Sequence, residues 1–259
     1  MPLEVTEISM IFGGVVALNK VSFSVGAGSI FGLIGPNGAG KTTMFNIIAG
    51  VFKPTSGSVL FDGRRLDTES NYLRVKRGIS RTFQNIRLFQ NMTVLENIVV
   101  GMHTKLKSTL LEALMSTPRW KAEEKKAREE AAEFLKTFGL GGRMNDLARS
   151  LPYGEQRILE MARALVTGAP VILLDEPAAG LNQVESARLI DLIRMIREKM
   201  GRTVLLVEHD MSVVMDVCEY IVVLDHGVKI AEGLPSEIRK NKMVIEAYLG
   251  RQYADEAGN

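Results

Sequence analysis

The chain has 259 residues, 46% of them hydrophobic, and a formal net charge of +2 at pH 7. This length suits one large domain or two lobes that share a core. The charge is too small to support a nucleic-acid-binding surface, so no nucleic acid is expected among the partners. Cys218 is the one cysteine, which excludes an internal disulfide, and its apolar neighbours predict a buried structural thiol.

Neither a membrane anchor nor an export signal is predicted. No apolar run approaches the roughly 18 residues that a membrane-spanning helix needs. Residues 1–4 lack the basic and apolar regions of a secretory signal. We therefore expect a soluble chain in the cytoplasm, whose association with a membrane depends on a partner.

The first third of the chain predicts short strands separated by glycine turns, over residues 3–12, 21–25 and 30–34. The third of these is an apolar run, which is typical of a strand buried on both faces. A glycine-rich loop follows it, and a helix is expected from Lys41 to Ala49, with Gly50 suited to the C′ position. A further strand and turn are expected at 59–63.

Residues 85–167 have helical character. Thr93 and Glu96 have the spacing of a capping box that opens a helix. The charged stretch at 120–138 predicts a helix with a solvated face rather than a binding role. Gly154 is expected to begin the next helix, which ends at a glycine followed by a proline.

Strands and helices alternate again after Pro170. Strands are predicted at 171–174, 203–207, 221–224 and 228–231, and helices at 184–200 and 235–249. Residues 225–227, Asp-His-Gly, predict a hairpin turn between the last two strands. The simplest architecture is an α/β core formed by 3–84 and 168–250, with a helical insert at 85–167 and a tail at 251–259.

A phosphate-binding loop follows the strand at 30–34. Its sequence is Gly35-Pro36-Asn37-Gly38-Ala39-Gly40-Lys41-Thr42-Thr43. Glycines allow backbone N–H groups to turn inward around phosphates, Lys41 supplies a positive charge, and the Thr42 hydroxyl suits Mg²⁺. The alternative is a glycine-rich turn with an incidental lysine. The strand before the loop and the helix after it favour a site for ATP and Mg²⁺.

Three candidate catalytic groups follow predicted strands. The strand at 171–174 leads to Asp175, a candidate ligand of Mg²⁺, and Glu176, which is placed to polarise a water molecule. His209 follows the strand at 203–207 and is expected at the same sheet edge, where it could hydrogen-bond a γ-phosphate. The alternatives are two acids that cap a strand and an edge histidine without a role.

Two further candidates lie in or beside the insert. Gln84 could ligate Mg²⁺ or hold the attacking water through its neutral amide, although a single glutamine is weak evidence. Gly154 opens a helix whose N-terminus can receive phosphate oxygens. If the insert projects from the core, that helix cannot easily reach the phosphate loop of its own chain, which predicts a second subunit.

Residues 3–250 resemble the ATP-binding subunit of an ABC transporter, with 151–157 in the place of the family's signature segment. The chain is also similar to the bacterial branched-chain amino-acid (leucine/isoleucine/valine) transport ATPases. That closer resemblance rests on the long insert, on the terminal Ala247-Tyr248-Leu249-Gly250, and on Phe12-Gly13-Gly14-Val15-Val16-Ala17-Leu18, Arg81-Thr82-Phe83-Gln84, Met92-Thr93-Val94-Leu95-Glu96-Asn97 and Asp175-Glu176-Pro177-Ala178-Ala179-Gly180-Leu181-Asn182.

The resemblance implies a fold and a role for each site residue. The fold is a P-loop NTPase (RecA-like) core with an N-terminal antiparallel β-subdomain and an inserted α-helical subdomain. The roles are Walker A for 35–43, the Q-loop for Gln84, Walker B for Asp175 and Glu176, the switch histidine for His209, adenine stacking for Phe12 with Val16 beside it, and contacts to the partner's ATP for Gly154 and Glu155.

The resemblance also implies partners. A head-to-tail dimer would enclose two ATP molecules beneath two transmembrane permease subunits, at the cytoplasmic face of the inner or plasma membrane. A periplasmic or extracellular amino-acid-binding protein would deliver the cargo. Homodimer and heterodimer both remain open.

Two positions depart from the family pattern, and other functions remain open. Pro152 replaces the usual signature serine and Asn182 the usual aspartate, so one composite ATP site is expected to be the weaker. The alternatives are an ABC ATPase for urea or amide uptake or for lipopolysaccharide export, or a non-transport ABC ATPase. Non-transport members usually carry two cassettes or a long coiled-coil insert, and this chain has one phosphate loop and neither.

Overall fold

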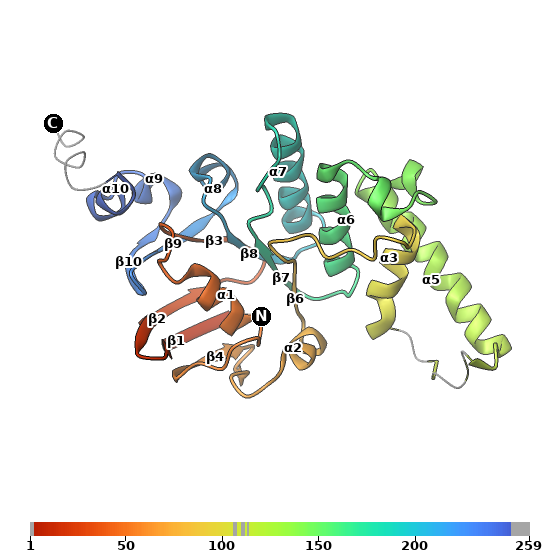
Figure 1. Cartoon of the computed structure of the whole chain (residues 1–259), viewed down its shortest axis with the longest axis horizontal. Coiled ribbons are helices and arrows are strands. Elements are labelled where there is room, and N and C mark those ends of the chain that lie inside the picture. Colours follow the sequence, from red (N-terminus) through yellow and green to blue (C-terminus); the bar gives the residue numbers. More distant parts are fainter. Residues whose placement is uncertain (1–2, 106–107, 110–111, 113, 250–259) are drawn as a thin grey trace. The chain divides into compact units, whose positions relative to one another are not determined.

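The computed structural model describes residues 3–105, 108, 109, 112 and 114–249 (Figure 1). The chain forms two compact units. One comprises Met1–Arg81 and Pro170–Asn259, and the other comprises Thr82–Ala169. We call them the core unit and the insert unit.

A six-stranded sheet forms the centre of the core unit. Its strand order is β10-β9-β3-β8-β7-β6, and β10 runs antiparallel to β9 while the other neighbours are parallel. The strands are β3 (Ile30–Ile34), β6 (Ile79–Arg81), β7 (Val171–Asp175), β8 (Thr203–Val207), β9 (Tyr220–Asp225) and β10 (Val228–Gly233). Every residue of β3, β7 and β8 is buried, as their apolar sequences predict.

A four-stranded antiparallel sheet, ordered β2-β1-β4-β5, completes the strands of the core unit. It contains β1 (Leu3–Phe12), β2 (Val15–Val25), β4 (Ser56–Phe61) and β5 (Arg64–Arg65). The strand predicted at 21–25 is longer than expected. Residues 15–20 give no clear alternation, and Lys20 has a φ of 49°, but pairing with β1 continues through several register shifts.

Six helices accompany the sheets within the described part of the core unit. They are α1 (Lys41–Ile48), α2 (Asn71–Arg77), α7 (Gln183–Glu198), α8 (Met211–Val217), α9 (Pro235–Ile238) and α10 (Lys242–Leu249). The single terminal helix predicted at 235–249 is wrong, because two short helices occupy that range. The Asn241 side chain accepts the Met243 N–H at 3.0 Å, so it starts a new helix where one helix was expected to continue.

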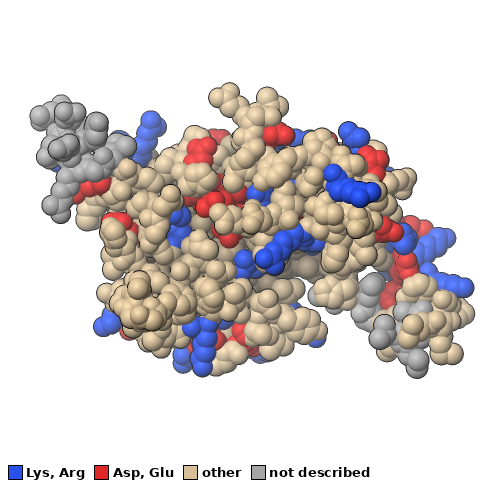
Figure 2. Space-filling view, viewed as in Figure 1, with Lys and Arg blue, Asp and Glu red and all other residues tan. Residues whose placement is uncertain are grey.

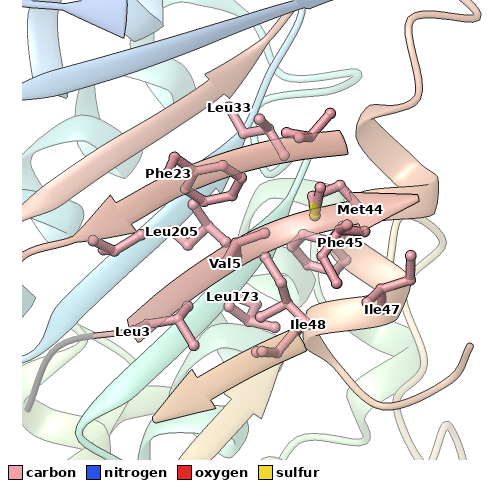
Figure 3. Close-up of a cluster of buried hydrophobic side chains, with 14 of the residues drawn as sticks. Leu3, Val5, Phe23, Leu33, Met44, Phe45, Ile47, Ile48, Leu173 and Leu205 are labelled. Carbon is pink, nitrogen blue, oxygen red and sulfur yellow. The ribbon is translucent and has the colours of Figure 1, made fainter. Parts of the chain in front are cut away.

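The main core lies around α1. Met44, Phe45, Ile47 and Ile48 point in several directions from this helix, yet all are fully buried, because α1 contacts β2 of one sheet and β7 and β8 of the other. Figure 3 shows these residues with Leu3, Val5 and Phe23 from the antiparallel sheet and Leu33, Leu173 and Leu205 from the six-stranded sheet. Each such side chain contributes roughly 1.5–3 kcal/mol on burial, and together they hold α1 at the end of β3.

Cys218 follows α8 and is buried, which confirms the expected structural thiol. Burial raises the pKa of this thiol to about 12, so it stays protonated at neutral pH.

The insert unit is helical. It contains α3 (Val94–Gly101), α5 (Pro118–Thr137), α6 (Tyr153–Leu165) and the short 3₁₀ segments η1 (Met102–Thr104), η2 (Gly141–Arg143) and η3 (Ala148–Ser150). Helix α3 contacts both α5 and α6. The predicted capping box is confirmed: Thr93 accepts the Glu96 N–H at 3.1 Å, and the Glu96 carboxylate accepts the Thr93 N–H at 2.8 Å.

The charged stretch of α5 forms a solvated face, as predicted. Glu124 and Arg128 are 3.0 Å apart, and the neighbouring Lys–Glu pairs on this face are also exposed. On the face of the molecule drawn in Figure 2, acidic and basic side chains are interspersed among uncharged ones. None of the helices in the described ranges is both long and apolar enough to cross a membrane.

A buried arginine fixes the far end of α1. Arg74 of α2 is 1% exposed, and its guanidinium donates to the carbonyl oxygens of Ile47, Ile48 and Leu66 at 2.5, 2.6 and 2.8 Å. The first two carbonyls lie in the last turn of α1, where a positive charge also complements the helix dipole. Arg74 therefore joins α1 to the segment that follows the antiparallel sheet.

Replacement of Arg74 by alanine should lower the free energy of unfolding by roughly 3 kcal/mol, because three buried carbonyls lose a charged donor. Urea denaturation followed by circular dichroism measures the change. Arg77→Ala is the matched control, since Arg77 pairs with Glu69 at the surface and should contribute less than about 1 kcal/mol. Equal effects of the two substitutions would contradict this role for Arg74.

Candidate active site

The loop between β3 and α1 requires glycine at two positions. Gly35 and Gly40 have φ angles of 150° and 100°. A Cβ on Gly35 would collide with the carbonyl oxygen of Leu224, and one on Gly40 would lie 2.7 Å from the carbonyl oxygen of Ala17. The predicted loop therefore packs its backbone directly against β9 and β2.

The β9–β10 turn supports the same loop. His226 and Gly227 have φ angles of 44° and 78°, as the central residues of a type I′ turn do, which confirms the predicted hairpin. The Gly227 N–H donates to the Ala39 carbonyl at 3.1 Å, and the Gly227 carbonyl accepts the Asn19 N–H at 2.8 Å. The turn is thus bonded on one side to the loop and on the other to β2.

Lys41 is the first residue of α1 and is 6% exposed. Its ammonium group donates to the carbonyl oxygens of Gly35 and Pro36 at 2.7 and 2.9 Å, so the side chain folds back over the loop. Burial lowers the pKa of Lys41, and the charge of Glu176 acts in the opposite direction. Lys41 and Glu176 are therefore within electrostatic reach of one another.

The start of α1 offers polar groups beside this lysine. Thr42 is exposed and Thr43 half-buried in the first turn, and Asn37 and Gly38 lie in the preceding loop. Among the residues with described positions, no side chain caps α1, whose N-cap residue is Gly40. The first N–H groups of a helix lack acceptors within the helix, so this end of α1 favours an anion.

Strand register brings the acidic candidates to the end of the loop. Val207, the last residue of β8, pairs with Leu33 of β3 on one side and with Asp175 of β7 on the other. Asp175 is 4% exposed. The loop and the acids therefore leave the sheet at the same level, which is the arrangement predicted for the carboxyl edge.

Glu176 and His209 lie next to each other at this edge. Glu176 has a φ of 45°, and its N–H donates to the Val207 carbonyl at 2.8 Å, which holds this left-handed backbone in place. His209 Nδ1 is 3.7 Å from Glu176 Oε2 and the histidine side chain is 56% exposed. The two predicted groups are therefore neighbours at this sheet edge.

Sequence reasoning missed Glu208. Its side chain is 0% exposed, and its two carboxylate oxygens accept the N–H of Ala178 at 2.7 Å and the N–H of His209 at 3.1 Å. Burial raises the pKa of Glu208, which the two backbone donors oppose. One carboxylate thus joins the loop after β8 to the turn after Glu176. An acid directly after the apolar strand at 203–207 was the available signal.

The tip of the β1–β2 hairpin is apolar and exposed. Phe12 and Val16 are 41% and 52% exposed, and Ile11 and Val15 beside them are exposed as well. Phe12 makes an edge contact with Phe52, with ring centroids 5.4 Å apart. Exposed apolar side chains of this kind suit a planar ring. The surface also lies beside the loop, because Ala17, which follows Val16, packs against Gly40.

The remaining candidates lie in the insert unit. Helix α6 begins at Tyr153, one residue before the predicted Gly154, and Pro152 is its N-cap residue. Gly154 is buried in the first turn, and Glu155 Oε2 lies 3.6 Å from Arg143 Nε. The carbonyl oxygen of Gln84 accepts a hydrogen bond from Arg157 at 3.0 Å.

Asn182, the second position that departs from the family pattern, caps α7 in the core unit. Its side chain accepts the N–H groups of Val184 and Glu185, each at 3.0 Å. The Asn182 side chain therefore acts as the N-cap of α7.

The donor set suits a magnesium ion that arrives with phosphates. Within the described ranges, no group of three or more His, Cys, Asp or Glu side chains could hold a metal ion. Mg²⁺ is usually held by one or two carboxylates together with substrate phosphates rather than by an all-protein cage. The Asp175 carboxylate at the sheet edge and the exposed Thr42 hydroxyl fit that pattern.

Comparisons with known proteins identify the family. The sequence family described as ABC transporter matches residues 18–179, and the family described as branched-chain amino acid ATP-binding cassette transporter matches residues 228–254. The high-affinity branched-chain amino acid transport ATP-binding protein BraF of Pseudomonas aeruginosa is 44% identical over 248 residues, which cover 96% of this chain and 97% of the relative.

Solved structures show the same fold. A nucleotide-free ATP-binding cassette from an ABC transporter superposes with a TM-score of 0.84 at 30% identity and covers 97% of this chain and 100% of its own. The dimeric structure of a bacterial ABC transporter cassette superposes with a TM-score of 0.75 at 28% identity, covering 90% and 98%. The fold and the loop with its acidic edge define an ATP-binding cassette. The chain belongs to the ABC transporter family, in the branched-chain amino-acid group of its ATP-binding subunits.

Glu208→Gln should reduce the ATP turnover number by roughly fivefold, because an amide offers one acceptor oxygen where the carboxylate offers two, and a hydrogen bond contributes about 1 kcal/mol. ATP affinity should change by less than about twofold, since Lys41 and its loop are untouched. Steady-state phosphate release and nucleotide titration measure the two quantities. Glu232→Gln, which removes a charge from a surface pair with Lys229, is the control. Unchanged turnover in Glu208→Gln would show that this carboxylate does not position the edge.

Proposed function

We propose that this chain is the ATP-binding and ATP-hydrolysing subunit of an ABC importer that takes up branched-chain amino acids. The observation that carries the proposal is the strand register that ends β3, before the loop of Lys41, level with Asp175 of β7, with Glu176 and His209 3.7 Å apart at the same edge. The cargo is supported by the 44% identity to a branched-chain amino acid transport protein of nearly the same length and by the match at residues 228–254.

The candidate residues have separate proposed tasks in nucleotide binding. Backbone N–H groups at 35–40 and the start of α1 would hold the β- and γ-phosphates, and Lys41 would neutralise their charge. Thr42, Asp175 and Gln84 would hold Mg²⁺, which supplies positive charge to the phosphate oxygens when bound. Phe12 and Val16 would pack against adenine.

Glu176 is proposed to act as the base in hydrolysis. It polarises a water molecule so that the water oxygen attacks the γ-phosphorus, while ADP departs. His209 donates a hydrogen bond to the γ-phosphate from the adjoining loop. The bonds from Glu176 N–H to Val207 and from Glu208 to Ala178 and His209 keep these groups in fixed positions before ATP arrives.

The chain is proposed to work as one half of an ATPase pair. Gly154 and Glu155 would contact ATP bound to a second ABC subunit, because the N-terminus of a helix attracts phosphate. A related cassette forms a dimer, which supports this pairing. We further propose that two permease subunits hold the pair at the cytoplasmic face of the membrane. A periplasmic or extracellular binding protein would supply the amino acid from the opposite side.

Glu176→Gln should retain ATP binding but reduce hydrolysis by at least roughly a hundredfold, because the amide cannot accept a proton. Filter binding of radiolabelled ATP and phosphate release measure the two effects. Lys41→Ala is the comparison variant, which should lose nucleotide affinity instead. Turnover near the wild-type rate in Glu176→Gln would overturn the role of Glu176.

Cells of the source organism that lack this chain should lose high-affinity uptake of radiolabelled leucine, isoleucine and valine. Expression of the wild-type chain should restore uptake, and Glu176→Gln should not, because the transport cycle depends on hydrolysis. Uptake of radiolabelled urea serves as the control for cargo. Loss of urea uptake with normal leucine uptake would contradict the proposed cargo while leaving the ATPase intact.

A further inference from the structure

The segment at 83–87, which contains Gln84, has no regular secondary structure, so its backbone groups need other partners. Side chains of α6 supply them. Arg157 donates to the carbonyl oxygens of Phe83 and Gln84, each at 3.0 Å. Glu160 accepts the N–H groups of Phe83 and Arg87 at 3.4 and 3.1 Å.

The side chains that hold this segment lie on one face of α6. Arg157, Glu160 and Arg163 are spaced three residues apart, and Arg163 donates to the Arg87 carbonyl. Arg157 and Glu160 are 1% and 2% exposed and form an ion pair at 3.3 Å. Burial of this pair costs free energy that its bonds to the backbone of 83–87 offset. A purely apolar face would not supply these donors and acceptors.

The same guanidinium also reaches the start of α6. Arg157 donates to the hydroxyl of Tyr153, the first residue of the helix, at 3.2 Å. It therefore contacts the backbone of Gln84 and the turn that contains Gly154. Arg157 thus links two parts of the insert unit with proposed tasks at ATP. Gln84 is proposed to act on the chain's own nucleotide, and the turn with Gly154 on the partner's.

We propose that Arg157 and Glu160 are positioning residues that fasten the Gln84 segment to the first turn of α6, so that both respond to nucleotide together. The inference rests on the proposed function, because the task of Gln84 in hydrolysis belongs to it. Lysine cannot replace Arg157, since one ammonium nitrogen cannot replace two guanidinium nitrogens that bond two carbonyl oxygens and the Tyr153 hydroxyl.

Arg157→Lys in the full-length chain tests the proposal without removing the charge. Backbone hydrogen exchange over 83–87 should accelerate at least about tenfold, because the segment loses its fastening. ATP turnover should fall by roughly tenfold with ATP affinity nearly unchanged. Arg128→Lys is the matched control in the same unit, since Arg128 pairs with Glu124 at the surface of α5. It should alter neither exchange nor turnover.

A double-mutant cycle separates positioning from general stability. If Arg157 acts through Gln84, then Gln84→Ala combined with Arg157→Lys should turn over ATP at the rate of Gln84→Ala alone. Unchanged exchange at 83–87, or two losses of turnover that multiply in full, would overturn the proposal. If thermal unfolding shows that Arg157→Lys does not fold, Glu160→Gln replaces it. Hydrogen exchange at the Phe83 and Arg87 amides should then accelerate. Unchanged exchange at these amides would overturn the proposal.

The failure of this inference and the failure of the proposed function give different results. A wild-type chain without ATPase activity would contradict the proposed function. An active wild-type chain that loses turnover in Gln84→Ala but not in Arg157→Lys would contradict the positioning role alone. A Gln84→Ala variant with full turnover would also contradict it, because the pair would have nothing to act through.

Discussion

The site depends on the register of three buried parallel strands. Val207 of β8 pairs with Leu33 of β3 and with Asp175 of β7, so the three strands end at one level. The phosphate loop, the acidic pair and the loop of His209 all leave the sheet there. A slip of one residue in β7 would turn Asp175 to the opposite face of the sheet and separate it from the loop. Hydrophobic burial of all three strands fixes that register.

Polar groups with backbone partners then hold each loop in place. Gly227 bonds the phosphate loop to the β9–β10 turn. Glu208 bonds the loop of His209 to the turn after Glu176. Arg74 of α2 bonds the carbonyl groups at the end of α1. Arg157 does the same for the Gln84 segment in the insert unit. The charged side chains among these groups, Glu208, Arg74 and Arg157, are almost fully buried. Their cost is offset because each satisfies several backbone groups in irregular segments.

Much of this site was predictable from the sequence because its signals are local. The spacing of Gly35, Gly40 and Lys41 and the acids after an apolar run identified the loop and the edge. The boundaries of β2 and the terminal helices were not predictable, because pairing with β1 and capping by Asn241 decide them. The tasks of Glu208 and Arg157 were missed for a related reason. The acid after the strand at 203–207 was a local signal for Glu208, but the backbone partners of the two side chains lie about 30 and 70 residues away, and no local pattern reveals them.

Titration of the full-length chain with ATP in a calorimeter, with and without Mg²⁺, tests the central claim most directly. The account predicts one ATP per chain and tighter binding with Mg²⁺, because the Asp175 carboxylate and the Thr42 hydroxyl are proposed to hold the ion against the phosphates beside Lys41. Absence of ATP binding, or an affinity that Mg²⁺ does not increase, would contradict the assignment of this edge as the nucleotide site.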